Sequence, residues 1–181
     1  LEKPYSIRAL RALVDAASKA APRGPGGQKA LIAKLVQSGA PDRHMETAFQ
    51  SKRRLSDGAI IGYEALLRIA VDGVSINPEA IFEPRVDLDT QLALTRAVLD
   101  DALRLGSALR NVGKPRTISV NCTPAILCTP ELPDMVLEAL DRWEMSASTL
   151  MIEITEHAAE HSFDVVATAA CRLAMRGCGI S

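Results

Sequence analysis

The chain alternates short apolar segments with longer amphipathic ones, and this order constrains its fold more than any other feature. Segments 59–71, 116–124 and 148–156 have the pattern of strands, while 90–110, 131–143 and 162–177 carry apolar residues at helical spacing. A further extended segment precedes them at 46–55, followed by a turn at 56–58, and residues 178–181 begin another strand. Strands that alternate with helices form parallel sheets covered by helices. We therefore predict an α/β fold.

The first 40 residues predict a different organisation. Residues 6–21 have apolar residues at helical spacing, and residues 22–28 contain two prolines and three glycines, which predicts a linker. A second short helix is expected from Gln28 to Gly39. We therefore divide the chain into residues 1–21, a linker at 22–28 and a main domain at 29–181.

Composition excludes several function classes. The net charge is −1, aromatic residues make up 3% of the chain, and no basic stripe is visible, which argues against a nucleic-acid-binding groove. No apolar run is long enough to span a bilayer, and we expect no signal peptide, because the first residues show no basic segment followed by an apolar one. The four cysteines fit no zinc spacing, so we expect small apolar side chains in a reducing cytoplasm.

The predicted strands carry oxygen-bearing side chains on one face. Side chains alternate along a strand, so Glu64 and Arg68 share a face, as do Ser119 and Asn121 on the next strand. The opposite faces are aliphatic and suit a covering layer of helices. Glu64, Asn121 and Glu153 lie near the carboxyl ends of their strands, and such oxygen ligands suit a hard divalent cation. The alternative, that each polar group pairs with a neighbour such as Glu64 with Arg68, stays open from spacing alone.

Three ordered motifs resemble a known family. "YEALLR" at 63–68, "ISVN" at 118–121 and "IEITE" at 152–156 resemble, in order and approximate spacing, the EAL domain of cyclic di-GMP phosphodiesterases. "FQ" at 49–50 precedes them where the family has a glutamine that contacts substrate, although Ser51 follows where a proline is usual. The resemblance extends over roughly residues 45 to 181. It implies a modified (β/α)8 barrel, TIM-like, whose first strand runs against the others.

The resemblance also implies the site. Two divalent cations, Mg²⁺ or Mn²⁺, would assist hydrolysis of cyclic di-GMP to linear pGpG. The implied metal ligands are Glu64, Asn121 and Glu153. Arg68 would contact a substrate phosphate, Gln50 the nucleotide, and Glu156 would support a loop near the metals.

The chain departs from the family pattern at its end. The family's next strand carries Asp-Asp-Phe-Gly, and the sequence stops at "RGCGIS" before it. The expected fold is therefore the first half of an EAL barrel, preceded by a helical remnant of a receiver domain, because "LEKPYSIRALRALVDAA" resembles the end of a response-regulator receiver. No complete catalytic set is present, so we expect the 181-residue chain alone to be inactive. The expected partners are cyclic di-GMP, a second copy in a homodimer and an upstream histidine kinase, in the cytoplasm, with no nucleic acid and no membrane.

Two other functions are compatible with parts of the sequence. A degenerate EAL domain would bind cyclic di-GMP or a partner protein without turnover. "HAAEH" at 157–161 matches an inverted zinc-peptidase motif, but it is short and no distant third ligand is identifiable. The basic residues at 52–54 are expected to form a solvated strand end, with some attraction for an anionic dinucleotide. Trp143 is expected to pack rather than to stack on a base.

Overall fold

The computed structural model describes residues 25–155 and 162–181 of the chain. Within these ranges the α-helices are α2 (Pro25–Gln37), α3 (Leu88–Asn111), α4 (Pro124–Leu127), α5 (Leu132–Arg142) and α6 (Phe163–Ala174). The 3-10 helices are η1 (Pro41–His44), η2 (Pro78–Ala80) and η3 (Ala147–Thr149). The strands are β1 (Met45–Arg53), β2 (Ile60–Val71), β3 (Val74–Ile76), β4 (Thr117–Cys122), β5 (Leu150–Ile154) and β6 (Gly179–Ile180).

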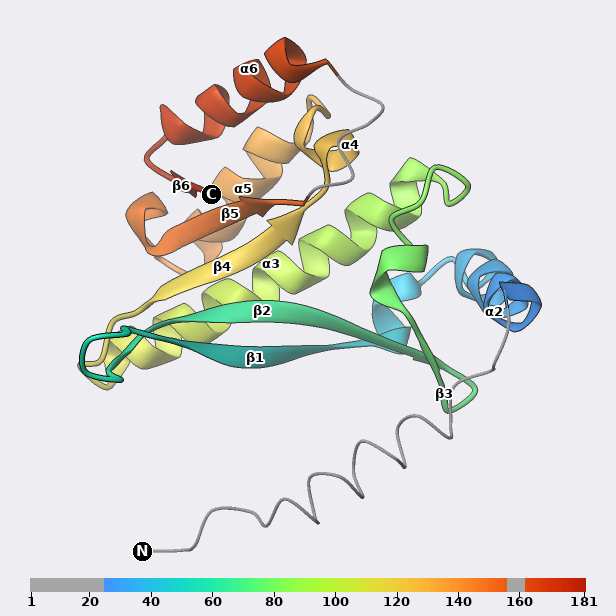
Figure 1. Ribbon diagram of the computed structural model, residues 1–181, viewed down its shortest axis with the longest axis horizontal. Helices are drawn as coiled ribbons and strands as arrows, with labels where there is room; N and C mark the ends of the chain where they lie inside the picture. Colours follow the sequence, from blue (N-terminus) through green and yellow to red (C-terminus); the bar gives the residue numbers. More distant parts are fainter. Residues whose placement is uncertain (1–24, 156–161) are drawn as a thin grey trace, which may run out of the picture.

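The strands form one mixed sheet with the order β1-β2-β4-β5-β6, and β3 adds to β2 (Figure 1). β1 runs antiparallel to β2, whereas β2, β4, β5 and β6 are parallel to one another. The α/β fold, the parallel strands and the reversed first strand are thus confirmed. Closure into a (β/α)8 barrel stays a prediction.

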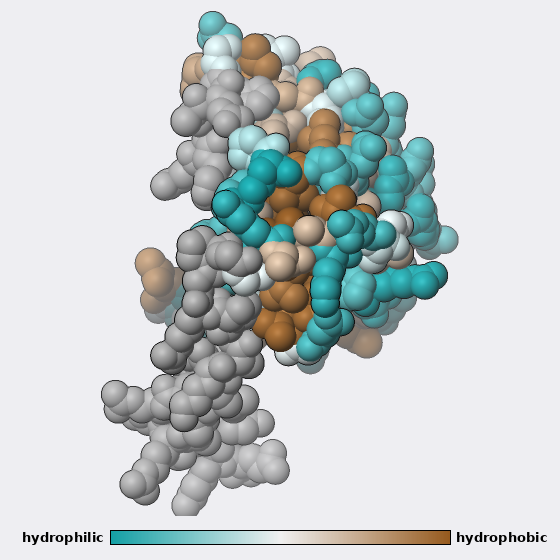
Figure 2. Space-filling view, turned by 90° about the vertical axis from the view of Figure 1, so that its right-hand side faces the viewer, coloured by the Kyte–Doolittle hydropathy of each residue, from teal (hydrophilic) through white to brown (hydrophobic). Residues whose placement is uncertain are grey.

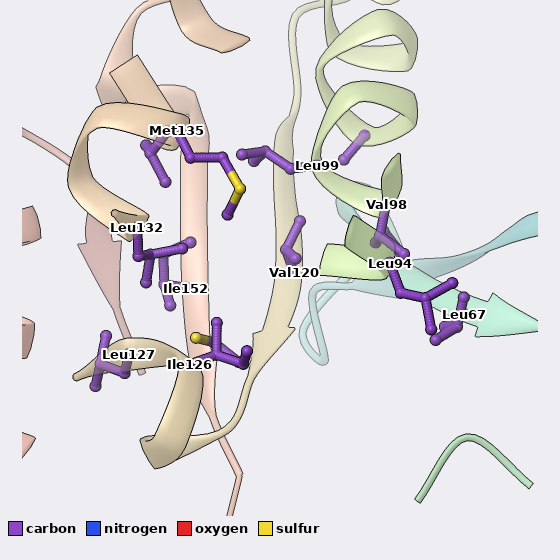
Figure 3. Packing of buried hydrophobic residues seen from close by; sticks show 14 of the residues in the cluster. Leu67, Leu94, Val98, Leu99, Val120, Ile126, Leu127, Leu132, Met135 and Ile152 are labelled. Carbon is purple, nitrogen blue, oxygen red and sulfur yellow. The ribbon is translucent and has the colours of Figure 1, made fainter. Parts of the chain in front are cut away.

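The core lies on one side of this sheet. The side chains of Ile118, Val120, Leu150 and Ile152 are at most 2% exposed, which confirms that the aliphatic faces of β4 and β5 are covered. Figure 1 shows α3 running along the sheet, and Figure 3 shows Leu94 of α3 beside Leu67 of β2. The opposite face is therefore the one that carries the polar side chains, because strand residues alternate between the two faces.

Local signals explain where the elements begin and turn. Asp87 caps α3, because its carboxylate accepts a hydrogen bond of 2.8 Å from the backbone N–H of Thr90. β2 and β3 are joined by Asp72 and Gly73, both with positive φ, in the two-residue hairpin that Asp-Gly favours. The Lys34 ammonium lies 2.6 Å from the Asp72 carboxylate, and this hydrogen bond lowers the pKa of Asp72.

One boundary differs from the prediction. α2 begins at Pro25, so residues 25–28, expected in a linker, form its first turn. Proline is well accommodated there, because the first N–H groups of a helix have no partner within it. The helix expected at 6–21 and the receiver remnant at 1–21 lie outside the described residues. No helix in the described ranges is both long enough and apolar enough to cross a membrane.

Candidate functional site

Glu64 and Asn121 meet on the polar face of the sheet. In the parallel pairing of β2 with β4, Glu64 lies opposite Ser119, which places Asn121 one side-chain step further along. The Asn121 amide Nδ2 donates a hydrogen bond of 2.9 Å to Glu64 Oε1. The alternative pairing of Glu64 with Arg68 is not observed, because the Arg68 guanidinium donates to the carbonyl of Leu67 at 2.9 Å.

Glu153 lies beside Asn121 but is held by a different partner. Asn121 and Glu153 are opposite each other in the β4–β5 register, so their side chains share a face. The carboxylate of Glu153 forms an ion pair with the ammonium of Lys52, which also donates a hydrogen bond of 2.8 Å to Ser119 Oγ. The expectation that residues 52–54 form a solvated strand end is therefore wrong for Lys52, whose side chain points onto the polar face.

The ion pair between Lys52 and Glu153 also indicates that the sheet is curved. Lys52 is on β1 and Glu153 is on β5, with β2 and β4 between them. On a flat sheet these outer strands would be about 14 Å apart, further than the two side chains span together. The sheet therefore curves, with its polar face on the concave side, and the curvature brings side chains from four strands to one place.

Gln50 and Arg68 flank the carboxylates. Gln50 is directly opposite Glu64 in the β1–β2 register, and Arg68 follows Glu64 by two side-chain steps along the same face of β2. Both side chains are exposed. The structure thus places Gln50, Glu64, Arg68, Asn121 and Glu153 on one face, whereas Glu156 lies outside the described residues.

A cavity of about 500 Å³ opens beside this group. Its lining includes Arg68, Asn121, Thr123, Thr155 and the aromatic ring of Phe82. Figure 2 shows a face of the molecule on which hydrophobic side chains lie between hydrophilic ones. The lining thus combines an apolar wall with a few polar groups, the cation of Arg68 and the carboxylate of Glu79, which is suited to an organic ligand with polar groups.

The donor set fits a hard divalent cation in its chemistry. Glu64 and Glu153 supply carboxylate oxygens, and the amide of Asn121 presents an oxygen when it is turned over. Within the described ranges no three His, Cys, Asp or Glu side chains cluster as a metal site, so the set rests on two carboxylates and one amide. Glu153 can bind a metal ion only when its carboxylate is released from the ion pair with Lys52.

The sequence placed Ser119 on the polar face but did not predict its hydrogen bond with Lys52, and it did not indicate the threonines of the cavity. A signal for Lys52 was present, because it is two residues from Gln50 and therefore shares its face. "HAAEH" at 157–161 lies outside the described residues. Trp143 packs partly buried against the core and its Nε1 donates to Asp100 at 2.9 Å, which confirms its packing role.

Known proteins resemble the chain in sequence and in structure. A Caulobacter vibrioides protein described as an uncharacterized signaling protein is 33% identical over 128 residues, which cover 70% of this chain but 16% of that protein. The structure of the phosphodiesterase PaMucR in complex with c-di-GMP matches with a TM-score of 0.72 and 26% identity, over 82% of this chain and 61% of the other. The chain thus spans less than two thirds of the length of either protein.

Two more distant structures share the fold. The EAL domain of Xanthomonas citri FimX, solved with c-diGMP, has a TM-score of 0.65 and 15% identity, over 94% of this chain and 62% of the other. The Bacillus subtilis YKUI protein, which has an EAL domain and was solved with substrate c-di-GMP and calcium, has a TM-score of 0.62 and 18% identity, over 82% of this chain and 37% of the other.

The family model for the EAL domain matches residues 35–181, ten residues earlier than the motifs alone had indicated. The match includes the hairpin of β1 and β2, the three motifs and the polar face on which their side chains meet. The chain belongs to the EAL domain family.

Proposed function

We propose that this domain holds divalent cations through Glu64, Asn121 and Glu153, and that the full-length protein hydrolyses cyclic di-GMP to linear pGpG. The observation that carries the proposal is the convergence of these three side chains from three parallel strands, beside a cavity lined by Arg68. The likeness to a phosphodiesterase solved with c-di-GMP supports the choice of substrate.

Each residue has a role that its position supports. The exposed guanidinium of Arg68 would pair with a nonbridging phosphate oxygen through charge-assisted hydrogen bonds. Gln50, opposite Glu64, would orient the nucleotide through its amide. Mg²⁺ or Mn²⁺, when bound, would supply the charge that activates water and stabilises the leaving oxygen. The neighbouring residues would then fix the phosphodiester relative to that charge.

The wider protein is part of the proposal. Residues 1–21 would belong to a receiver domain that an upstream histidine kinase controls, and the EAL domains would pair as a homodimer in the cytoplasm. Glu156 would support a loop near the metals. In such a protein the strands that complete the barrel would supply the remaining metal ligands.

The test is turnover by the full-length protein. Purified protein with Mn²⁺ or Mg²⁺ is expected to convert cyclic di-GMP to pGpG, and Glu64→Ala is expected to abolish this conversion without lowering the melting temperature, because a ligand carboxylate adds little to the core. The matched control is Glu138→Ala, which removes a carboxylate that pairs with Arg96 at 3.3 Å on the surface. Near-normal turnover by Glu64→Ala would show that Glu64 is not a ligand.

A second candidate function is a non-catalytic sensor. The ion pair between Lys52 and Glu153 favours it, because that carboxylate already has a cationic partner. A sensor would bind cyclic di-GMP with similar affinity in the presence of Mn²⁺ or of a chelator, and would release no pGpG. Calorimetric titration under both conditions, beside the turnover assay, separates the two functions.

A further inference from the structure

Lys52 makes its contacts with the same carboxylate that the proposed metal site needs. Its ammonium pairs with Glu153 and donates to Ser119 Oγ at 2.8 Å. Ser119 is almost completely buried, with 2% of its surface exposed, and it lies directly opposite Glu64. The ammonium therefore lies on the polar face beside Ser119, the β4 neighbour of Glu64, and contacts Glu153, which is one side-chain step further along the strands.

Two features of the β1–β2 hairpin direct Lys52 to this position. The register between the strands shifts between Lys52 and Arg53, so an irregularity ends the regular pairing there, and bulges of this kind re-aim side chains next to sites. The residue opposite Lys52 is Gly62, which has no side chain to obstruct the lysine as it crosses β2. A Cβ on Gly62 would lie 2.7 Å from the carbonyl oxygen of Thr117, so any other residue would force the backbones of the two strands to shift.

The charges explain what Lys52 does to a bound cation. Glu64 and Glu153 carry two negative charges, and the Lys52 ammonium offsets one of them. A divalent cation that approaches Glu153 must replace the ammonium and is then repelled by it if it stays nearby. The pair is not sealed from water, because the side chains of Lys52 and Glu153 are 36% and 21% exposed. Exchange of the ammonium for a metal ion therefore requires only a rotation of the lysine side chain.

We propose that Lys52 is an internal competitor of the divalent cation for Glu153, so that the domain holds metal more weakly than its carboxylates and amide would allow. This inference rests on the proposed metal site. It assigns to the domain two states, one in which Glu153 binds Lys52 and one in which it binds metal. In the second state Lys52 is released toward Gln50 on the same face of β1.

The test is the affinity of the full-length protein for Mn²⁺, measured from the electron paramagnetic resonance signal of the unbound ion. Lys52→Met keeps the length of the side chain and removes its charge, and we expect it to bind Mn²⁺ about tenfold more tightly or better, since about 1.4 kcal/mol corresponds to tenfold. Lys52→Gln, measured in parallel, is expected to act in the same direction. Circular dichroism checks that both variants are folded.

The matched control is Lys34→Met. Lys34 also pairs with a carboxylate, that of Asp72 at 2.6 Å, but on the surface of α2, and its removal should leave the Mn²⁺ affinity unchanged. The gain from Lys52→Met should also disappear when Glu153→Gln is added. An unchanged or weaker affinity in both folded Lys52 variants would overturn the inference.

The metal site itself is tested separately. Glu64→Gln and Glu153→Gln, each in the presence of Lys52, should weaken Mn²⁺ binding. If neither does, the proposed metal site is wrong. If both do while the Lys52 variants bind as the wild type does, the metal site stands and Lys52 is only a structural partner of Glu153.

Discussion

We propose that single residues on the polar face have separable roles, and Arg68 offers the clearest test. Its guanidinium lies on the same face as Glu64 but bonds to the carbonyl of Leu67, not to the carboxylate. A residue that touches the substrate without touching the metal ligand should affect the two kinds of binding differently.

We expect Arg68→Ala to weaken binding of cyclic di-GMP by about 1.5–3 kcal/mol, the range of hydrogen bonds to charged groups. Mn²⁺ affinity should not fall, because Arg68 is a cation and pairs with neither carboxylate. Arg68→Lys should restore only part of the loss, because an ammonium lacks the planar fork that binds phosphate oxygens in pairs. Calorimetric titration with the dinucleotide and with Mn²⁺ measures both effects. A parallel loss of both affinities would contradict the separation of roles.

At the level of the elements, the close approach of β2 and β4 at Gly62 holds the strands that carry Glu64 and Asn121 in register. Gly62→Ala would bring a methyl group to 2.7 Å from the Thr117 carbonyl, a backbone atom that cannot turn away. We expect a loss of about 1–3 kcal/mol in the free energy of unfolding, the usual range for overpacking. Denaturation in urea measures it.

The control for Gly62→Ala is Ile61→Ala on the same strand, whose side chain is 45% exposed. This change should cost less, because an exposed side chain loses little buried contact. Equal losses in the two variants would contradict the close contact with Thr117 as the cause of the lost stability.

The elements were largely predictable from the sequence, because apolar periodicity and caps are local signals. β1, β2, α3, β4, α5, β5 and α6 all lie where the pattern placed them. The hairpin of β2 and β3 was missed although "VDGV" contains the Asp-Gly pair that such a turn favours. The three residues of β3 are too few for a periodic signal.

The site was predictable only in part. The shared face of Glu64, Asn121 and Glu153 was predictable from the alternation of side chains along each strand, and their role as metal ligands stays a prediction. The ion pair of Lys52 with Glu153 joins residues 101 positions apart, and it depends on the curvature of the sheet and on an irregularity in one hairpin. Neither property is encoded in a short stretch of sequence. The basic composition of residues 52–54 therefore predicted a solvated strand end instead.

For the whole molecule, global stability should respond to alkaline pH through Cys122. Burial, and to a smaller extent Cys128, raises the pKa of Cys122 from 9.0 to about 12. Below pH 9 the thiol is protonated in both the folded and unfolded chains, and its contribution to the free energy of unfolding is fully present. Above pH 9 the unfolded chain loses the proton and the folded one keeps it, so stability falls until the pH reaches about 12.

Urea denaturation at about pH 8 and about pH 10, with a reducing agent, tests this expectation. The wild type should lose about 1.4 kcal/mol for each pH unit above the thiol's unfolded pKa, in addition to losses from other groups. Cys122→Ala should lose less stability between the two pH values, because only the other groups then contribute to the loss. Cys171→Ala, which removes an exposed thiol, should keep the wild-type loss. Identical losses in all three proteins would contradict the buried thiol as the cause.

The one-sided core has a consequence for how such a domain changes over generations. The aliphatic faces of β4 and β5 pack under the helices, while the side chains that would meet ligands project from the opposite face. Substitutions of the exposed polar side chains on the concave face therefore cost little folding stability, unlike those at closely packed positions such as Gly62. A lineage can lose or regain chemistry there by single replacements and remain well folded throughout, so an intact architecture is no guide to whether a given copy still turns over its ligand.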